Sequence, residues 1–529
     1  MAEEEPPLIR LFLRSCRLAG RVIRLGDGEG RLRESLSFLG WGVREGEVRA
    51  LALLSSLLPL LLLTLLPLSP CFLLSPLLSP LLYLAVRDFP VRRAEAERRK
   101  GLGEVPELLC SLSTSLLLNP NPEVAGRFAA EGGGRMGRDL RRELSLLLLR
   151  VHREAGEALR SLSGRWGRPE ELEKPLTLLL ASVERGEGRR EAVERALELS
   201  LGGLRARMEE FVGWLRLPLL LLYSFGILLP LCLLTLLPTV ASLGLLSSPL
   251  PLALLYCFLL PLLGYLLGSW ILSRRPCPSR GERARRRPPS PSFLLPLFLL
   301  LFLPLLPGEA KVMAFLWSVT LSLSLYLLPS GREREEERRR LEEERDLPQA
   351  LAELGNELRE GRPLEEALVR VGRAHGWEGG PPGRILSLLR GLAERSEKAA
   401  GEAALHLSRH LRRLREVEER GRREMGEILS SLRSVALCFS PLLSSLTCQM
   451  YALVWRKGMM AGAPSPPLLL LLLGVHTLSL TFLLLHLASE VEGEGEVGRR
   501  WRLASGLPLS LLVFTLGSWG GGMVLGWLT

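Results

Sequence analysis

Long apolar runs alternate with blocks rich in arginine and glutamate along this chain of 529 residues. The runs 51–86 and 217–273 contain no charged residue. A helix of about 20 apolar residues crosses the hydrocarbon core of a bilayer, so each of these runs can hold two spans. In all we expect an all-α protein with about nine transmembrane helices: a hairpin in 51–86, a pair in 217–273, a pair in 291–330 (291–307 and 312–330), a pair in 434–488 (434–455 and 466–488) and a C-terminal helix in 503–529.

The basic residues fall on one side of these spans. Ionised side chains are costly at the bilayer centre, and cytoplasmic loops collect Lys and Arg. With a cytoplasmic N-terminus, only Lys311, Arg456 and Lys457 of the 68 Lys and Arg residues lie outside. The cytoplasmic segments are then an N-terminal amphipathic region 1–50, a first helical domain 87–216, a basic loop 274–290, a second helical domain 331–433 and a loop 489–502. This pattern predicts a multi-pass protein of the cell (plasma) membrane.

The net charge of +11 follows from the same asymmetry. A basic inner face attracts anionic lipid or acidic partners. No recognisable nucleic-acid-binding motif accompanies the charge, so we expect the lipid bilayer as a partner and no nucleic acid.

The first 25 residues show a basic stripe rather than the pattern of a cleavable signal peptide. Its arginines recur at helical spacing, and apolar residues occupy the opposite side: Arg10, Arg14, Arg17, Arg21 and Arg24 against Leu11, Leu18, Val22 and Ile23. This spacing favours a helix lying at the inner membrane surface. A helix packed on the protein's own cytoplasmic domain is the alternative.

The two large hydrophilic blocks are both predicted to be helical, and each ends in a helix that runs toward a span. The segment 191–216 leads to the span that begins near 217, and 401–433 leads to the span that begins at 434. Arg216 and Arg433 therefore stand at two junctions where motion of a block would pass into the membrane. Alternatively, both arginines only anchor helix ends at the lipid headgroups. The charged segment 332–345 is predicted to extend the preceding span.

The two blocks also share a pattern that indicates duplication. In the second block, a helix is predicted to begin at Pro348 and to stop at Gly361. The same skeleton occurs earlier, with Asn119 in the place of Gly361 as a residue tolerated in a left-handed cap. The remaining matches pair Pro106 with Pro348, Leu109 with Leu351, Leu112 with Leu354, Leu116 with Leu358 and Ala125 with Ala367.

This arrangement resembles the type II secretion system F family. The residues that carry the resemblance are Leu347-Pro348-x-Ala350-Leu351-x-x-Leu354 and Leu358-Arg359-x-Gly361-x-Pro363-Leu364-x-x-Ala367-Leu368. It covers roughly 87–273 and 331–488, and the long chain is most similar to the archaeal members. The resemblance implies a non-enzymatic platform beneath a type IV pilus, archaellum or secretion fibre. Such a platform would be a homodimer that passes the motion of a hexameric secretion ATPase to pilin-like subunits.

The residues needed for catalysis do not occur in recognisable arrangements. The dipeptide Gly-Lys of a phosphate-binding loop is absent from the sequence, and His406 and His410 lack a third ligand at useful spacing. We expect these two histidines to be solvated or to lie on the bundle surface. The glycine run at 132–134 is predicted to be a loop. We therefore expect no enzymatic activity, no catalytic residue, no metal and no cofactor.

Two other functions remain open. A polytopic transporter or permease usually keeps ionisable groups at mid-membrane, and here His476 and His486 lie within a predicted span. His476 would be either a proton relay or one partner in a helix–helix hydrogen bond. A membrane scaffold that shares the fold without building a fibre is the third class.

Two clusters of arginines on the second block are candidates for binding the ATPase. They are Arg338, Arg339 and Arg340 in one cluster and Arg412, Arg413 and Arg415 in the other. A solvated helix face laced with ion pairs would have the same composition, and it is the competing interpretation.

Overall fold

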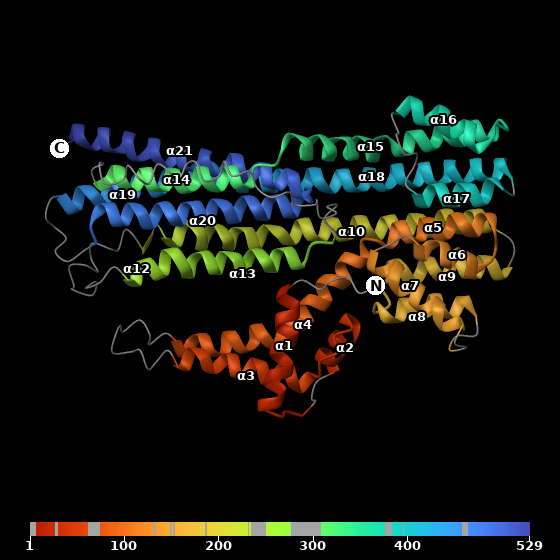
Figure 1. Cartoon of the computed structure of the whole chain (residues 1–529), viewed down its shortest axis with the longest axis horizontal. Helices are drawn as coiled ribbons and strands as arrows, with labels where there is room; N and C mark the ends of the chain where they lie inside the picture. Colours follow the sequence, from red (N-terminus) through yellow and green to blue (C-terminus); the bar gives the residue numbers. More distant parts are fainter. Residues whose placement is uncertain are drawn as a thin grey trace. The chain divides into compact units, whose positions relative to one another are not determined.

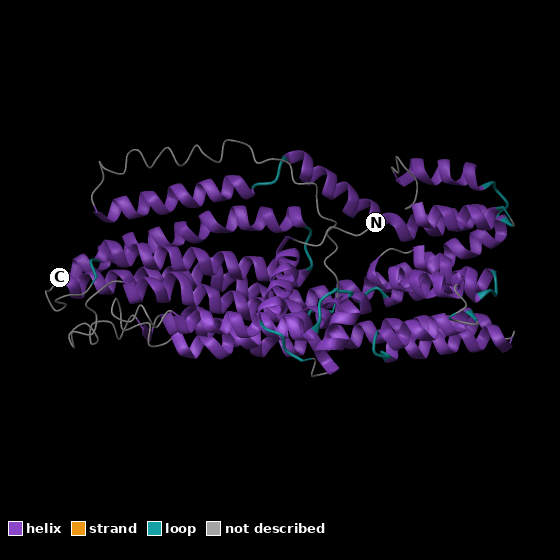
Figure 2. Cartoon of the chain, turned by 60° about the horizontal axis from the view of Figure 1, so that its bottom comes forward, coloured by secondary structure: helices purple, strands orange, loops and turns teal. Residues whose placement is uncertain are grey.

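The structure is a computed structural model of the chain. It describes all residues except 1–6, 27–29, 62–74, 132–133, 149–150, 152–153, 186–187, 231, 234–249, 277–307, 376–382, 395, 457–463 and 529. The chain divides into two compact units, Met1–Lys100 and Gly101–Thr529. Every regular element in the described part is a helix (Figures 1 and 2), which confirms the predicted all-α class.

The N-terminal unit is built from four helices: α1 (Pro7–Val22), α2 (Gly30–Leu39), α3 (Glu45–Leu61) and α4 (Ser75–Leu102). Its core joins Cys16 of α1, Leu36 of α2 and Val48 of α3. The ring of Phe12 lies 4.8 Å from that of Phe89 on α4. Burial raises the pKa of the Cys16 thiol to about 12, so this cysteine acts as an apolar filler of the core.

The second unit contains the remaining helices, in which η marks a π-helical turn. They are α5 (Val105–Leu118), α6 (Pro122–Glu131), α7 (Gly134–Leu148), α8 (Ala155–Arg165), α9 (Glu170–Arg185), α10 (Arg189–Tyr223), η3 (Ser224–Leu228), α12 (Leu250–Leu254), η4 (Leu255–Leu259), α13 (Leu260–Ser273), α14 (Gly308–Leu327), α15 (Gly331–Arg359), α16 (Leu364–His375), α17 (Gly383–Ala393), α18 (Glu397–Ser434), η6 (Val435–Phe439), α19 (Ser440–Arg456), α20 (Pro466–Glu492) and α21 (Glu496–Leu528).

Six helices of the described part are long and apolar enough to cross a membrane, which supports a membrane-embedded protein. They are Arg189–Leu228, Leu252–Ser273, Gly308–Leu327, Glu397–Arg456, Pro466–Glu492 and Glu496–Gly521. Each of the six overlaps a predicted span. The predicted span 291–307 lies outside the described residues, as do residues 62–74 of the predicted hairpin. The two helices that contain the described parts of this hairpin, α3 and α4, are not among the six, so the count of nine stays a prediction.

Helix α20 is the centre of the apolar bundle. In its most apolar window 61% of the residues are buried, whereas the other five candidates reach at most 44%. It packs against α13, α14, α18, α19 and α21. A helix that is apolar on all sides, as α20 is, belongs inside a bundle.

The matched positions of the two hydrophilic blocks are buried in both. Leu109, Leu112 and Leu116 lie in the core on α5, and Leu351, Leu354 and Leu358 lie in the core on α15. Gly361 ends its helical segment with φ of +88°, as predicted. Asn119 does not, because its φ of −134° is extended rather than left-handed. The first block has helices α5–α9 before its long last helix, and the second has α15–α17, so duplication stays a prediction.

Two predictions about α15 are wrong. The charged segment 332–345 does not extend the preceding span, because α14 ends at Leu327 and a new helix begins at Gly331. Ser330 and Glu333 form a reciprocal capping box at that start, which satisfies backbone groups that would otherwise have no partner. Nor does Pro348 begin a helix, since α15 runs through it to Arg359.

Candidate functional site: two helical stalks and their membrane junctions

Two long helices connect the hydrophilic blocks to the apolar bundle. The first stalk is α10 with η3, unbroken over Arg189–Leu228, and the second is α18 with η6 and α19, unbroken over Glu397–Arg456. Both pass through the predicted junction arginines, Arg216 and Arg433, without a break. Figure 1 shows α10 and α18 leading from the blocks toward the bundle. The predicted continuity of block and span is therefore confirmed on both stalks.

The stalks pack against each other before they enter the bundle. Phe211 and Leu215 of α10 share a buried cluster with Met425, Leu429 and Leu432 of α18. Gly421 lets the helices approach closely, because a Cβ there would lie 2.5 Å from the Sδ of Met208. Further along, the hydroxyls of Tyr223 and Ser431 are 3.2 Å apart. The two stalks are thus joined by packed side chains along this stretch.

Side chains of α20 reach the π-helical turns of both stalks. The ring nitrogens of His476 lie 3.3 Å from the carbonyl oxygen of Gly226 in η3 and 3.1 Å from that of Tyr256 in η4. The Thr481 hydroxyl donates to the carbonyl oxygen of Ala436 in η6 at 3.0 Å. Carbonyls released from the regular helical pattern need such partners inside a membrane. The contacts of His476 match the helix–helix hydrogen bond expected as one of its two roles.

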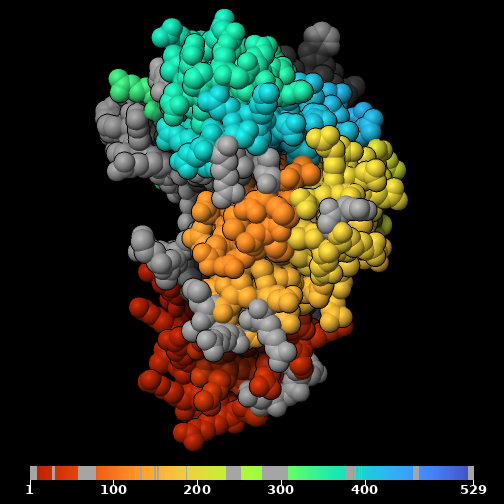
Figure 3. Space-filling model, turned by 90° about the vertical axis from the view of Figure 1, so that its right-hand side faces the viewer, coloured from red at the N-terminus to blue at the C-terminus, as the bar shows by residue number. Residues whose placement is uncertain are grey.

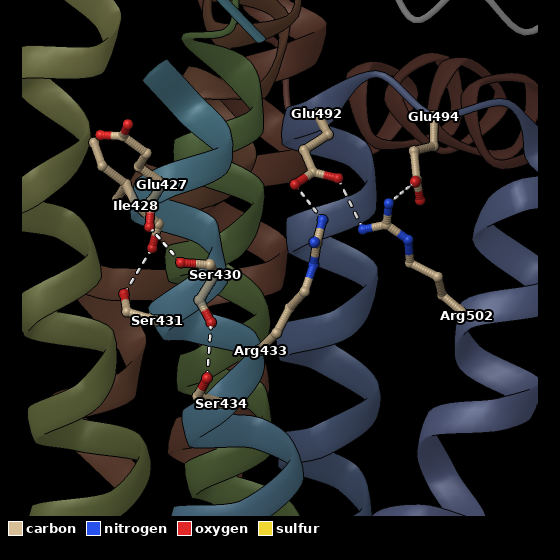
Figure 4. A network of polar contacts seen from close by, with 9 residues as sticks. All are labelled: Glu427, Ile428, Ser430, Ser431, Arg433, Ser434, Glu492, Glu494 and Arg502. Atoms are coloured by element: carbon tan, nitrogen blue, oxygen red, sulfur yellow. Dashed lines mark hydrogen bonds and ion pairs between the residues drawn. The ribbon is translucent and has the colours of Figure 1, made fainter. Parts of the chain in front are cut away.

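The second stalk meets a network of ion pairs at its junction (Figure 4). Arg433 pairs with Glu492, which also accepts a hydrogen bond from Nη1 of Arg502 at 2.8 Å. Arg502 pairs in addition with Glu494. The side chain of Glu492 is only 15% exposed, so its two pairs are partly shielded from water.

This network depends on the short turn between α20 and α21. The predicted loop 489–502 is mostly helix, since α20 ends at Glu492 and α21 begins at Glu496. Gly493 makes the turn with φ of +76°, a conformation that glycine adopts at little cost. On the far side, Arg500 lies 3.7 Å from Glu333 of α15 and donates to the carbonyl of Leu327 on α14 at 3.2 Å.

The first stalk has a different junction. Arg216 is exposed, and within the described part of the chain it has no hydrogen bond or ion pair. The polar contact near it comes from Arg274, whose guanidinium lies 4.7 Å from the Trp214 ring and 5.4 Å from the Trp270 ring. The two indoles are 5.0 Å apart and meet edge to face. This is an aromatic belt with a cation over it, typical of a membrane interface.

Sequence reasoning identified Arg433 but missed its partners Glu492 and Arg502, and it missed Trp214 and Arg274. A usable signal was present. Acidic residues alternate at 490, 492, 494 and 496 in a short segment between two spans, and basic residues follow at 499, 500 and 502. Opposite charges confined to so short a turn can pair across it.

The six arginines that are candidates for binding a partner lie on two helices that pack together, α15 and α18. Arg338 and Arg339 are exposed on α15 and pair with Glu342 and Glu335 of the same helix at 2.9 Å and 3.5 Å. Arg340 is also exposed. Arg412 and Arg413 are exposed on α18, whereas Arg415 is half-buried and donates to the carbonyl of Arg345 on α15. Arg415 is thus a contact between helices, and the other five remain accessible.

The histidines His406 and His410 do not lie in solvent. His410 is 3% exposed, and its Nε2 lies 3.1 Å from the carbonyl oxygen of Pro106 on α5. The Nδ1 of His406 lies 3.4 Å from the Thr114 hydroxyl on the same helix. Burial lowers the pKa of each histidine to about 4. The expectation of solvated residues is wrong because α18 packs on the first block as well as the second (Figure 3).

The N-terminus of α7, at the end of the glycine run, is capped by the carboxylate of Glu104. Glu104 accepts hydrogen bonds from the backbone N–H groups of Arg135 and Met136 at 3.2 Å and 3.0 Å, at the start of α7. Burial raises the pKa of Glu104, and these two N–H groups oppose the rise. The helix start that could have held a phosphate is therefore already capped from within.

Within the described ranges, no cluster of three or more His, Cys, Asp or Glu residues could hold a metal ion. Comparisons with models of protein families, with curated proteins and with solved structures found no match.

Proposed function

We propose that this chain is the membrane platform of a type II secretion or type IV pilus-like fibre assembly system. In this role it couples a hexameric cytoplasmic ATPase to the assembly of pilin-like subunits, with the N-terminus and both hydrophilic blocks in the cytoplasm and with two copies forming a homodimer. The observation that carries the proposal is the pair of unbroken stalks, Arg189–Leu228 and Glu397–Arg456. A helix that belongs to both a soluble block and a membrane bundle transmits displacement between them.

The contacts of the stalks support a mechanical role. The stalks touch each other through Met208 and Gly421. Helix α20 contacts the first stalk through His476 and the second through Thr481. A push or rotation applied to a block would thus reach the most buried helix of the bundle. The exposed arginines Arg338–Arg340, Arg412 and Arg413 offer the ATPase an accessible basic surface on the second block.

The competing transporter function depends chiefly on His476. Both of its ring nitrogens lie at backbone carbonyls, and its side chain is 3% exposed. These contacts suit a structural tie between helices better than a relay that exchanges protons along a path. We therefore favour the platform.

Flexible insertions test the proposal. Gly-Gly-Ser placed after Arg216 or after Arg433 would interrupt one stalk and leave the blocks folded. We expect either insertion to abolish fibre assembly in cells while the ATPase still co-purifies with the protein. The matched control is the same insertion after Gly167, an exposed glycine with φ of +85° in the turn between α8 and α9. Assembly that survives both stalk insertions would rule out transmission through the stalks.

Capture of the ATPase tests the basic surface separately. Charge reversal at Arg412 and Arg413 should reduce co-purification of the ATPase, because both side chains are exposed. Reversal at Arg415 should act differently, through the loss of its bond to α15. Unchanged capture by the Arg412→Glu/Arg413→Glu variant would remove this surface from the account.

A further inference from the structure

Helix α1 is covered on one face only. Ile9, Cys16 and Ala19 are buried against the rest of the N-terminal unit, and α1 packs mainly on α3. At 100° per residue these three positions share one side of the helix. This face of α1 is therefore covered by the N-terminal unit itself.

The opposite face of α1 is apolar and exposed. Leu11, Leu18 and Val22 are 65%, 61% and 73% exposed. They fall within about 40° of one another around the helix, and they extend over about 16 Å of its length. Single exposed leucines are ordinary on protein surfaces, but an aligned row on one helix face indicates a binding surface.

A row of arginines runs beside these apolar side chains. Arg10, Arg14, Arg17 and Arg21 are all exposed, and Arg24 follows the helix. Their row lies about 90° from the row of Leu11, Leu18 and Val22, so it flanks the apolar side chains instead of opposing them. Helix α1 contains no Asp or Glu.

We propose that α1 docks on an anionic lipid bilayer, with Leu11, Leu18 and Val22 entering the headgroup region and the flanking arginines binding lipid phosphates. The two rows suit the two layers of a membrane surface, because arginine side chains beside an inserted apolar stripe reach the phosphates. An acidic protein would match the arginines but would leave the apolar row without a partner. The six candidate spans also place a bilayer beside every copy of this chain.

A fluorescent amino acid at position 18 reads out this docking in the full-length protein. The protein is reconstituted into nanodiscs of phosphatidylcholine alone or with increasing phosphatidylglycerol, and brominated lipids serve as quenchers. We expect quenching to rise with the phosphatidylglycerol content and to fall in 1 M salt. Each arginine near an anionic surface strengthens binding about fivefold, so Arg14→Glu/Arg21→Glu should weaken docking by about 25-fold or more.

The matched control changes the same net charge elsewhere in the unit. Arg31 and Arg33 are exposed on α2, and Arg31→Glu/Arg33→Glu should leave quenching unchanged. Equal loss in both double variants would show that only net charge matters and would overturn the proposal. So would quenching that is independent of phosphatidylglycerol, or a label shielded from water but not quenched by brominated lipid. If Arg14→Glu/Arg21→Glu fails to fold, the salt response of the unmodified stripe decides the question.

Discussion

The two stalks share their layout but differ in what holds them. Each is an unbroken helix, each contains a π-helical turn, and in each a carbonyl oxygen of that turn lies against a polar side chain of α20. The second stalk has further anchors: the pair of Arg433 with Glu492 at the junction, and His410 against the first block. The first stalk instead leaves Arg216 in solvent beside the belt of Trp214 and Trp270. Two junctions with similar sequences therefore differ in their contacts, and the second stalk is the more firmly fixed.

Acid should weaken the second stalk's attachment to the first block. The folded state keeps His406 and His410 neutral with pKa values of about 4, whereas the unfolded chain binds protons near 6.5. The unfolded state thus binds more protons between these values, so stability rises with pH from 4 to 6.5 and is level above. At about 1.4 kcal/mol per pKa unit, this shift lowers the stability in acid by on the order of 3 kcal/mol for each histidine. Thermal unfolding at several pH values, compared with His406→Gln/His410→Gln, measures this; parallel pH profiles would refute it.

Removing the negative charge of Glu492, which Arg433 and Arg502 share, should destabilise the second junction. Glu492→Gln leaves Arg433 and Arg502 without their common counter-charge in a partly buried site, at an expected loss of about 2–3 kcal/mol. Arg216→Gln on the first stalk should cause no measurable loss, because that side chain is exposed and has no partner among the described residues. Thermal unfolding in nanodiscs compares the two variants. Equal losses of stability in the two variants would show that the two junctions do not differ in how firmly they are held.

The contact of α18 with α15 should tolerate no side chain at Gly401. A Cβ there would lie 2.8 Å from the carbonyl oxygen of Gly355, so the helix backbones would have to separate. We expect Gly401→Ala to destabilise the protein by about 2 kcal/mol. Gly426 on the same helix has open space around it, and Gly426→Ala should stabilise slightly through helix propensity. Chemical denaturation of the two variants distinguishes these opposite signs, and equal shifts would contradict the close contact.

Loss of the hydrogen bond from Thr481 to Ala436 should have the smallest effect on the free energy of unfolding. Thr481→Val removes the hydroxyl that donates to Ala436 and lies 2.9 Å from the Ser510 hydroxyl, for an expected loss of about 1 kcal/mol. The control is Thr515→Val, because among the described residues the Thr515 hydroxyl bonds only to the Leu512 carbonyl of its own helix. A loss no greater than that of the control would show that η6 does not depend on α20.

Much of the fold could be predicted from the sequence because it follows from periodicity and charge. The runs that became α20 and α21 are apolar over the length of a bilayer, and the leucines of α5 and α15 repeat at helical spacing. The path through Pro348 was not predictable in this way, because the capping box at Ser330 starts the helix upstream and packing on α18 keeps it intact.

The site could be predicted only in part. Arg433 was identifiable because it lies at the boundary between a charged block and an apolar run. Its contact with Glu492 joins residues far apart in the chain, which neither spacing nor hydropathy reports. The same holds for His410, whose partner Pro106 lies 304 positions earlier. A histidine on a charged helix resembles a solvated residue until the helix that covers it is known.

Amide hydrogen exchange across the two junctions shows whether both stalks are continuous helices in a membrane. In nanodiscs, we expect slow exchange without interruption from residue 205 to 228 and from residue 420 to 450, with the amides around Arg433 slower than those around Arg216. A segment of fast exchange at either arginine would show that the helix is broken where force must pass, and it would contradict transmission through the stalks.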